Sequence, residues 1–292
     1  MTSEASIAVV GVGAIGGSVA AAIGDVGHRV QLCVRTSFDE LQRELNGETT
    51  VYEHSIVADQ NTSAPVDWLL LATKAHQTAS AKIWFDRLVG SKTRVAILQN
   101  GVEHTERLDG LVDPSATLLP CVVRLPATAI GPGNIVQDRN GKLVVPTGPV
   151  GDEFQNLFTG QDAIRVETTD DFISVAWDKL VRNAATGICA LTRTSMGVMA
   201  EPAARELALG LIREIVAVGE AEGAVFSPEL EQKFFASYEG NETWTSIAKD
   251  ARDGKPTEWD ARNAVIGRIG RKHGIATPIN DAITTLLKLA DA

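Results

Sequence analysis

The N-terminal segment, an apolar run that leads into a glycine-rich loop, constrains the fold more than any other feature of the chain. Residues 7–10 read Ile-Ala-Val-Val, and residues 11–16 follow with the spacing Gly-x-Gly-x-x-Gly. Helix-forming residues at 18–23 and a second apolar run at 29–34 complete the pattern. A strand, a loop, a helix and a second strand within about 30 residues form a βαβ unit. The segment therefore predicts a parallel α/β sheet that begins with the first strand.

Each glycine of this loop has its own physical role in binding a pyrophosphate. Gly11 permits a tight turn, Gly13 leaves no Cβ in the way of the phosphates, and Gly16 lets the helix pack closely on the strand. The N–H groups of the first helical turn face the anion. We therefore expect a dinucleotide to bind at a set of loop residues that comprises Gly11, Gly13, Ala14, Ile15 and Gly16. A glycine-rich turn without a ligand is the alternative.

The residue at the end of the second strand discriminates between the two nicotinamide dinucleotides. An NAD site places Asp or Glu about 20 residues after the glycines to accept the ribose 2′-OH, whereas an NADP site needs positive charge for the 2′-phosphate. This chain has Arg35 there, followed by the hydroxyl residues Thr36 and Ser37. A guanidinium pairs with phosphate through two parallel hydrogen bonds and stacks on an adenine. The sequence predicts NADPH, and the alternative is an exposed strand-end arginine with Asp39 and Glu40 close by.

Length, composition and charge exclude several classes of protein. With 292 residues, 44% of them hydrophobic and 22% charged, the chain is typical of a globular protein of two domains. Its formal net charge of -10 argues against a nucleic-acid-binding surface, which needs a basic stripe. The sequence contains neither a basic leader nor an apolar run of the roughly 18 residues that a membrane span needs. We therefore expect neither a nucleic acid nor a membrane as a partner.

The cysteines and histidines do not indicate a disulfide framework or a metal site. Cys33, Cys121 and Cys189 lie far apart without Cys-x-x-Cys spacing, which fits reduced thiols. The five histidines form no ligand pattern such as His-Glu-x-x-His. We expect a cytoplasmic protein that needs no metal.

Further apolar runs continue the α/β pattern through the first half of the chain. Residues 66–72, 94–98 and 117–123 are apolar and bounded by polar residues, glycine or proline. Such near-continuous runs predict parallel strands buried on both faces of a sheet. Residues 78–89 are predicted to form a crossover helix between two of these strands.

A hairpin signal and then a change of periodicity indicate two domains. Two apolar segments flank Asn140-Gly141, a dipeptide that favours the two-residue turn of a β-hairpin. Helical patterns then replace the strands. We expect an α/β Rossmann-like domain with a mainly parallel sheet over residues 1–167 and an all-α domain over residues 168–292. A ligand cleft between them is the default expectation for this architecture.

Several segments of the second domain have helical periodicity. Residues 172–183 predict one helix, Thr257 is a candidate cap for another, and a last helix is expected to begin at Pro278. A stripe with a period of about 3.6 residues predicts one more helix. The stripe consists of Leu207, Leu211, Ile215 and Val218. Exposed apolar faces of these helices would suit a homodimer, whereas the same stripes would also suit an internal core.

Four polar residues occupy positions where ligands bind or chemistry occurs. Lys74 and Asn100 each follow a predicted strand, at the sheet edge that carries ligand-binding loops. Lys179 and Asn183 are i and i+4 on a predicted helix and share a face. Reduction of a ketone by hydride needs a proton donor and positive charge beside the oxygen, and a lysine ammonium supplies both. The alternatives are that Lys74 is a solvated loop lysine, that Asn100 belongs to a simple Asn-Gly turn, and that Lys179 forms a surface ion pair.

Taken in order, short motifs along nearly the whole chain resemble the ketopantoate reductase family. They are GVGAIGG at 11–17, Arg35, TKA at 73–75, LQNG at 98–101, WDKL at 177–180 with Asn183, TSIAKD at 245–250, and TE at 257–258. The resemblance implies NADPH-dependent reduction of 2-dehydropantoate (ketopantoate) to pantoate, a step toward pantothenate and coenzyme A. It also implies that the cofactor is NADPH and the partner a small 2-keto acid.

The resemblance also implies roles for individual residues. Lys179 matches the family's general acid, and Glu258 matches a carboxylate that anchors substrate and supports catalysis. Asn183 and Ser246 match polar groups that contact substrate. Asn100 matches a residue that contacts both cofactor and substrate.

The resemblance further places Lys74 near the cofactor and substrate. At one position this sequence departs from the family pattern. The family often has a second asparagine one turn after Asn183, where this chain has Gly187. Loss of a side-chain donor to substrate weakens binding by on the order of 1 kcal/mol or more, which would favour a different 2-keto acid. A related NADP-dependent reductase acting on another 2-keto acid, a hydroxy acid or an opine-type substrate, and a non-enzymatic NADP-binding or redox-sensing protein, are the alternatives.

Overall fold

The computed structural model describes residues 5–238 and 242–291. The chain folds into two compact units. The α/β unit comprises residues 1–99 and 104–172, and the helical unit comprises residues 100–103 and 173–292. The boundary predicted between residues 167 and 168 stays a prediction. The short segment 100–103 belongs to the helical unit although it follows a strand of the α/β unit. The sequence alone does not indicate this assignment.

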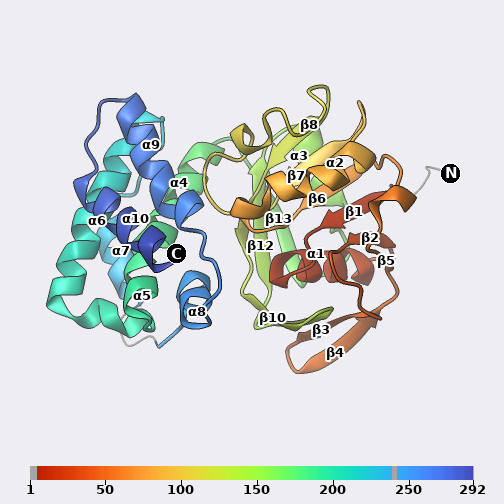
Figure 1. Cartoon of the computed structure of the whole chain (residues 1–292), viewed down its shortest axis with the longest axis horizontal. Helices are drawn as coiled ribbons and strands as arrows, with labels where there is room; N and C mark the ends of the chain where they lie inside the picture. The colour runs from red at the N-terminus through yellow and green to blue at the C-terminus, as the bar shows by residue number, and fades with distance from the viewer. Residues whose placement is uncertain (1–4, 239–241, 292) are drawn as a thin grey trace. The chain divides into compact units, whose positions relative to one another are not determined.

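A six-stranded, all-parallel sheet forms the centre of the α/β unit, with the strand order β5-β2-β1-β6-β7-β8 (Figure 1). Its strands are β1 (Ile7–Val10), β2 (Val30–Cys33), β5 (Ser55–Val57), β6 (Trp68–Leu71), β7 (Arg94–Ile97) and β8 (Thr117–Pro120). Counted along the chain, this order is 3-2-1-4-5-6, the order of Rossmann dinucleotide-binding domains. The predicted fold class is confirmed in this unit.

Both faces of this sheet are buried, as the continuous apolar runs predict. Along β1, Ile7 and Val9 belong to one hydrophobic cluster, and Ala8 and Val10 to another. Successive side chains of a strand point to opposite faces, so each face has its own core. Helix α2 (Lys82–Leu88), shorter than the predicted 78–89 and preceded by two 3₁₀ turns, contributes to the second cluster.

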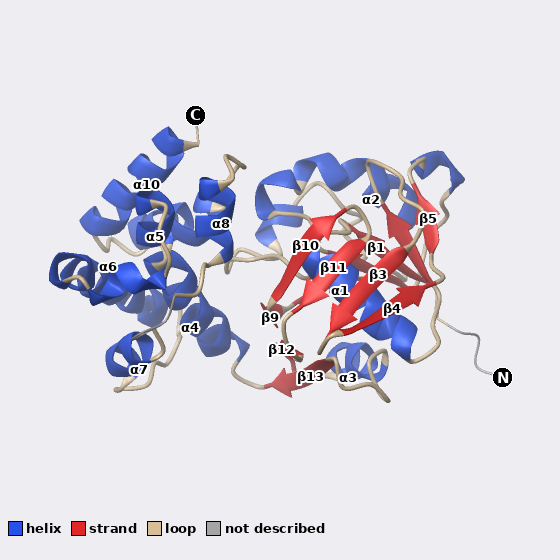
Figure 2. Cartoon of the chain, turned by 90° about the horizontal axis from the view of Figure 1, so that it is seen from below, coloured by secondary structure: helices blue, strands red, loops and turns tan. Residues whose placement is uncertain are grey.

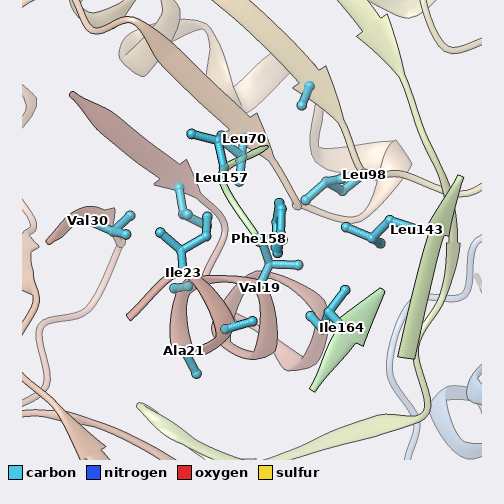
Figure 3. Packing of buried hydrophobic residues seen from close by; sticks show 14 of the residues in the cluster. Val19, Ala21, Ile23, Val30, Leu70, Leu98, Leu143, Leu157, Phe158 and Ile164 are labelled. Carbon is cyan, nitrogen blue, oxygen red and sulfur yellow. The ribbon is translucent and has the colours of Figure 1, made fainter. Parts of the chain in front are cut away.

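Helix α1 (Ala14–Asp25) lies between two sheets. It contacts β1 and β2 of the parallel sheet, and also β3 (Leu41–Leu45), β10 (Ala127–Gly131) and β11 (Asn134–Gln137). These last three strands and β4 (Glu48–Tyr52) form a four-stranded sheet, in the order β10-β11-β3-β4 (Figure 2). In Figure 3, Val19 and Ile23 of α1 point toward the side where Leu70 and Phe158 lie. A helix covered on two sides must be apolar nearly all round, which its alanine-rich sequence provides.

The third sheet overturns the predicted hairpin at Asn140-Gly141. It has three strands, β9 (Val122–Arg124), β12 (Gly141–Pro146) and β13 (Ile164–Thr169), while β11 belongs to the four-stranded sheet. Neither Asn140 nor Gly141 has the positive φ that a type I′ hairpin turn requires. Asn46-Gly47 does, with φ values of 54° and 80°, and it joins β3 to β4. The predicted strand 117–123 is likewise divided, because β9 leaves the parallel sheet for the third one.

The described part of the helical unit contains helices and no strand, as predicted. The unit contains α4 (Phe172–Ala185), α5 (Gly187–Thr192), α6 (Pro202–Ala221), α7 (Leu230–Ala236), α8 (Ser246–Arg252), α9 (Val265–Lys272) and α10 (Pro278–Ala290). The predicted stripe on α6 is buried at Leu211, Ile215 and Val218, but Leu207 is exposed. The α/β unit adds helix α3 (Pro149–Asn156).

Thr257 does not cap a helix, contrary to the prediction. Its hydroxyl donates to the carboxylate of Asp291 at 3.0 Å, and its N–H donates to the same group at 2.8 Å. The helix after it starts with a π-helical turn, Asp260–Ala264, that has no side-chain cap. Within residues 5–238 and 242–291, no helix combines the length and apolar character needed to cross a membrane.

Candidate active site

The glycine loop combines a positive φ, close packing of α1 and open space at the start of that helix. Gly11 has a φ of +96°, and a Cβ there would lie 2.6 Å from the Thr73 nitrogen. A Cβ at Gly16 would lie 2.1 Å from the Gly11 carbonyl oxygen, so close packing of α1 on the loop requires glycine. A Cβ at Gly13 would meet nothing within 4 Å, which leaves open space beside the start of the helix. Gly11 and Gly16 meet the packing constraints that the sequence predicts, and the role of Gly13 toward a phosphate stays a prediction.

Electrostatics at the start of α1 also suit an anion. Gly13 is the N-cap residue, with no side-chain cap, and Ala14 and Ile15 begin the first turn, which contains no acidic residue. The partial positive charge of a helix N-terminus favours an anion at this place. Arg35 follows β2 closely and is exposed, so its guanidinium is accessible to a ligand on this strand end.

Lys74 lies in a loop that a buried glutamine organises. It follows β6, the strand paired with β1 at the point where the strand order reverses. Gln99 is 2% exposed, and its side-chain amide donates to the Thr73 carbonyl at 3.1 Å and to the Thr73 hydroxyl at 2.9 Å. Ligands of doubly wound sheets bind at this reversal point. The loop that carries Lys74 is thereby held in one conformation beside the glycine loop.

In the helical unit, Asn100 is the centre of a hydrogen-bonded network with three residues that the sequence singled out. Lys179 Nζ donates to Asn100 Oδ1 at 3.0 Å, and Asn183 Nδ2 approaches the same oxygen at 3.4 Å. Asn100 Nδ2 donates to Glu258 Oε2 at 2.9 Å. Lys179 and Asn183 are one turn apart on α4, as their spacing predicts. Residues 79 to 158 positions apart in the sequence thus form one cluster.

The chemistry of these groups fixes the orientation of the Asn100 amide. An ammonium only donates and an ionised carboxylate only accepts, so the amide oxygen faces Lys179 and the amide nitrogen faces Glu258. Glu258 is 4% exposed, and a charged carboxylate so buried needs hydrogen-bond partners and a nearby cation. The arrangement holds an ammonium ready to donate and a carboxylate ready to accept, separated by a neutral amide.

Arg262 supplies the cation next to Glu258, and sequence reasoning missed it. The two lie at i and i+4, with Arg262 Nη2 3.8 Å from Glu258 Oε2. The same nitrogen donates to Ser246 Oγ at 2.7 Å. Burial lowers the pKa of Arg262 below its ordinary value, and the negative charges of Glu258 and Asp250 oppose that shift. The Glu-x-x-x-Arg spacing is the signal that could have identified this arginine.

A second arginine missed by the sequence analysis holds the segment that carries Asn100. Arg268 Nη2 lies 2.6 Å from Glu103 Oε2, and Arg268 Nη1 lies 2.6 Å from Asp260 Oδ1. Burial opposes the charge of this guanidinium, but its hydrogen bonds to Glu103 and Asp260 raise the pKa of Arg268. This bridge between residues 100–103 and α9 keeps Asn100 in the helical unit.

Position 187, where the motif departs from the family pattern, is closely packed in the helical unit. A Cβ built on Gly187 would meet atoms of Leu287 at 3.2 Å, Asn263 at 3.3 Å and Ile283 at 3.4 Å. Two of these residues belong to α10. A side chain at 187 would therefore start among the residues of the helical core.

A Rossmann-ordered sheet with a glycine-rich loop and a partly buried lysine–amide–carboxylate network are the parts of an oxidoreductase. Comparison with known proteins gives the family. The family model described as "Ketopantoate reductase PanE/ApbA" matches residues 7–149, and its "C terminal" counterpart matches residues 171–291. The chain belongs to the ketopantoate reductase family and is an oxidoreductase.

Individual relatives are similar over almost their whole length. A 2-dehydropantoate 2-reductase of Caulobacter vibrioides is 40% identical over 98% of this chain and 99% of its own. One from Mycobacterium tuberculosis is 34% identical over 97% of both chains. Among solved structures, a PanE/ApbA family ketopantoate reductase from Ralstonia eutropha has a TM-score of 0.89 at 26% identity, with 98% of each chain covered. A D-mandelate dehydrogenase solved with NADH and anilino(oxo)acetate also has a TM-score of 0.89, at 22% identity over 98% of each chain, and shares the fold.

Proposed function

We propose that this protein reduces ketopantoate to pantoate with NADPH, and that Lys179 is the proton donor. In this reaction a hydride adds to the keto carbon and a proton adds to the keto oxygen, which converts the ketone to a secondary alcohol. The observation that carries the proposal is the Lys179–Asn100–Glu258 network, because it holds an ammonium in a partly buried setting with defined partners. The relatives named 2-dehydropantoate 2-reductase support the choice of substrate.

The dinucleotide is assigned to the glycine loop and to Arg35. NADPH supplies the hydride when it is bound. The open space at Gly13 and the uncapped start of α1 suit its pyrophosphate, with Ala14 and Ile15 in the first turn. The exposed guanidinium of Arg35 suits the 2′-phosphate, which NADH lacks. Lys74, in its ordered loop, is assigned to the cofactor as well.

Lys179 has two functions in this proposal. Its ammonium stabilises the negative charge that develops on the keto oxygen and then transfers a proton to it. Asn100 accepts one of the three ammonium N–H bonds, which fixes the direction of the other two. Asn100 itself is assigned to both cofactor and substrate.

The remaining polar residues are assigned to substrate binding. Asn183, one turn after Lys179, offers an amide on the same helix face, and Ser246 offers an exposed hydroxyl at the start of α8. Glu258 accepts from Asn100 and supports Lys179 through it; it is also assigned to anchoring a substrate hydroxyl. Ketopantoate is the favoured keto acid because the relatives are named 2-dehydropantoate 2-reductase. The product would serve pantothenate and coenzyme A synthesis in the cytoplasm, and a homodimer remains a prediction.

A substrate panel tests the proposal. We expect the wild-type protein to oxidise NADPH in the presence of ketopantoate, with a kcat/KM at least about tenfold above those for pyruvate and 2-oxobutyrate. NADH should support the reaction less well than NADPH. A higher kcat/KM for a smaller keto acid would favour a related 2-keto-acid reductase. Tight NADPH binding without turnover of any keto acid would favour a non-enzymatic NADP-binding protein.

A further inference from the structure

We propose that Arg262 is a positioning residue that makes the Ser246 hydroxyl a donor toward the substrate carboxylate, and so selects acidic over neutral keto substrates. The proposal rests on the proposed function and adds a specificity determinant to it. It concerns a residue inside the helical core whose guanidinium is directed at two residues assigned to the substrate.

The Arg262 guanidinium lies inside the core of the helical unit. Arg262 is 3% exposed, which is rare for an arginine without a specific task. It lies in the π-helical turn Asp260–Ala264, and such turns often occur at functional sites because they redirect side chains. Its partners are Ser246 at 2.7 Å, Glu258 at 3.8 Å and the nearby charge of Asp250.

The hydrogen bond between Arg262 and Ser246 has only one possible direction. A guanidinium has donors and no acceptor, so the serine oxygen accepts from Arg262 Nη2. The single hydroxyl proton of Ser246 is then available to donate in another direction. Ser246 is exposed, so a ligand can reach that proton. A carboxylate, which only accepts, is the matching group of a 2-keto acid.

Arg262 also offsets the negative charge near Ser246. Glu258 is buried, and Arg262 is a cation that compensates its negative charge. Without Arg262, less of that negative charge near Ser246 would be compensated. Its repulsion of a substrate carboxylate would then increase. In a variant without the guanidinium, the Ser246 hydroxyl would also be free to turn toward a carboxylate such as Glu258 or Asp250. Arg262 therefore favours an anionic substrate through both hydrogen-bond direction and charge.

The test compares ketopantoate with its neutral lactone, ketopantoyl lactone, in wild-type protein and in Arg262→Met. We expect the variant to raise the KM for ketopantoate by about tenfold or more, with a smaller change in kcat, since a hydrogen bond to a charged group is lost. The preference for ketopantoate over the lactone should fall by a similar factor. A merely structural defect would lower both activities equally and leave the preference unchanged, and that result overturns the proposal.

Two further variants connect the effect to Ser246. In a Ser246→Ala background, Arg262→Met should raise the KM by less than about threefold, because the hydrogen-bond contribution is already absent and only the contribution of charge is left to lose. Arg262→Lys, which keeps a donor and the charge, should recover part of the preference. Arg43→Met is the matched control: Arg43 is also a buried arginine in an ion pair, 2.9 Å from Asp25, and its loss should lower Tm without changing substrate preference.

Calorimetric titration with pantoate separates this proposal from the proposed function. If the wild-type protein turns over no keto acid, the proposed function fails, while tenfold weaker pantoate binding by Arg262→Met would still support the inference. Equal binding by both proteins, or no binding by the wild type, would overturn it. Wild-type turnover with an unchanged preference in the variant would overturn the inference alone.

Discussion

The glycine loop of the α/β unit and the Asn100 network of the helical unit contrast in how they are built. The loop uses backbone geometry over six consecutive residues, and Gly11 and Gly16 are required there because a Cβ would meet Thr73 or Gly11. The network uses side chains from residues 100, 179 and 258, which only the folded chain brings together. A site made of backbone can be predicted from a short segment of sequence, whereas a site made of side chains from distant segments depends on tertiary structure. Variants of the two regions should therefore fail in different ways.

The largest effect is expected at the network. Lys179→Ala should lower kcat for ketopantoate reduction by about 10²–10⁴-fold, because it removes the proton donor and the charge beside the oxygen. NADPH affinity, measured by fluorescence titration, should stay within a small factor of the wild-type value. Lys233→Ala is the control, since Lys233 pairs with Glu229 on the exposed face of α7. Near-normal kcat in Lys179→Ala would remove Lys179 from its assigned role.

Two glycine variants sharpen the contrast at the loop. Gly16→Ala would place a Cβ 2.1 Å from the Gly11 oxygen, so we expect a loss of about 1–3 kcal/mol in the free energy of unfolding together with weaker NADPH binding. Gly13→Ala has space for its Cβ, so it should weaken NADPH binding with little change in Tm. Thermal unfolding and nucleotide titration of both variants measure this difference. Unchanged NADPH binding in Gly13→Ala would argue against a pyrophosphate at the loop.

A smaller and more selective effect is expected at Arg35. Arg35→Ala should raise the KM for NADPH by about tenfold or more, since a charged hydrogen bond to the 2′-phosphate is lost. The KM for NADH and the KM for ketopantoate should change little. Steady-state kinetics with both nucleotides provide the measurement. An equal effect on NADH and NADPH would contradict the assignment of Arg35 to the 2′-phosphate.

The smallest expected effect is a pH dependence of stability at His54, away from both sites. Burial lowers the pKa of His54, the Ala20 carbonyl opposes this shift, and Arg29 adds to it. The folded state therefore favours neutral His54, and its contribution is present above the unfolded pKa of about 6.5 and is lost as the pH falls below that value. His54→Gln should reduce the fall in Tm between about pH 7 and pH 5 by about 1–2 °C. An identical Tm profile in the variant would show that another group causes the pH dependence.

The local parts of the fold could be predicted from sequence, and the reason is visible in β1 and α1. Within a short stretch of chain, their apolar runs and glycines predict both the secondary-structure elements and the way these pack. The hairpin prediction failed because Asn140-Gly141 and Asn46-Gly47 are the same dipeptide, and only backbone φ values distinguish a type I′ turn. β11 joins the four-stranded sheet while β9 and β12 join the three-stranded one, and this division depends on long-range pairing, which local patterns do not encode.

For the candidate site, sequence reasoning named residues and missed the groups that hold them in place. Lys179, Asn100 and Glu258 were identified individually, and the structure groups them. Arg262 and Arg268 were missed because a helical arginine is usually solvated, and nothing local says that these two are partly or fully buried against carboxylates.

An isotope label on NADPH follows the hydride from cofactor to product. Wild-type protein is mixed with ketopantoate and NADPH deuterated at the transferred position, and the product is examined by mass spectrometry. We expect pantoate with deuterium at the former keto carbon, formed in equal amount to the NADPH consumed. NADPH bound without formation of pantoate, or pantoate without deuterium, would contradict this expectation.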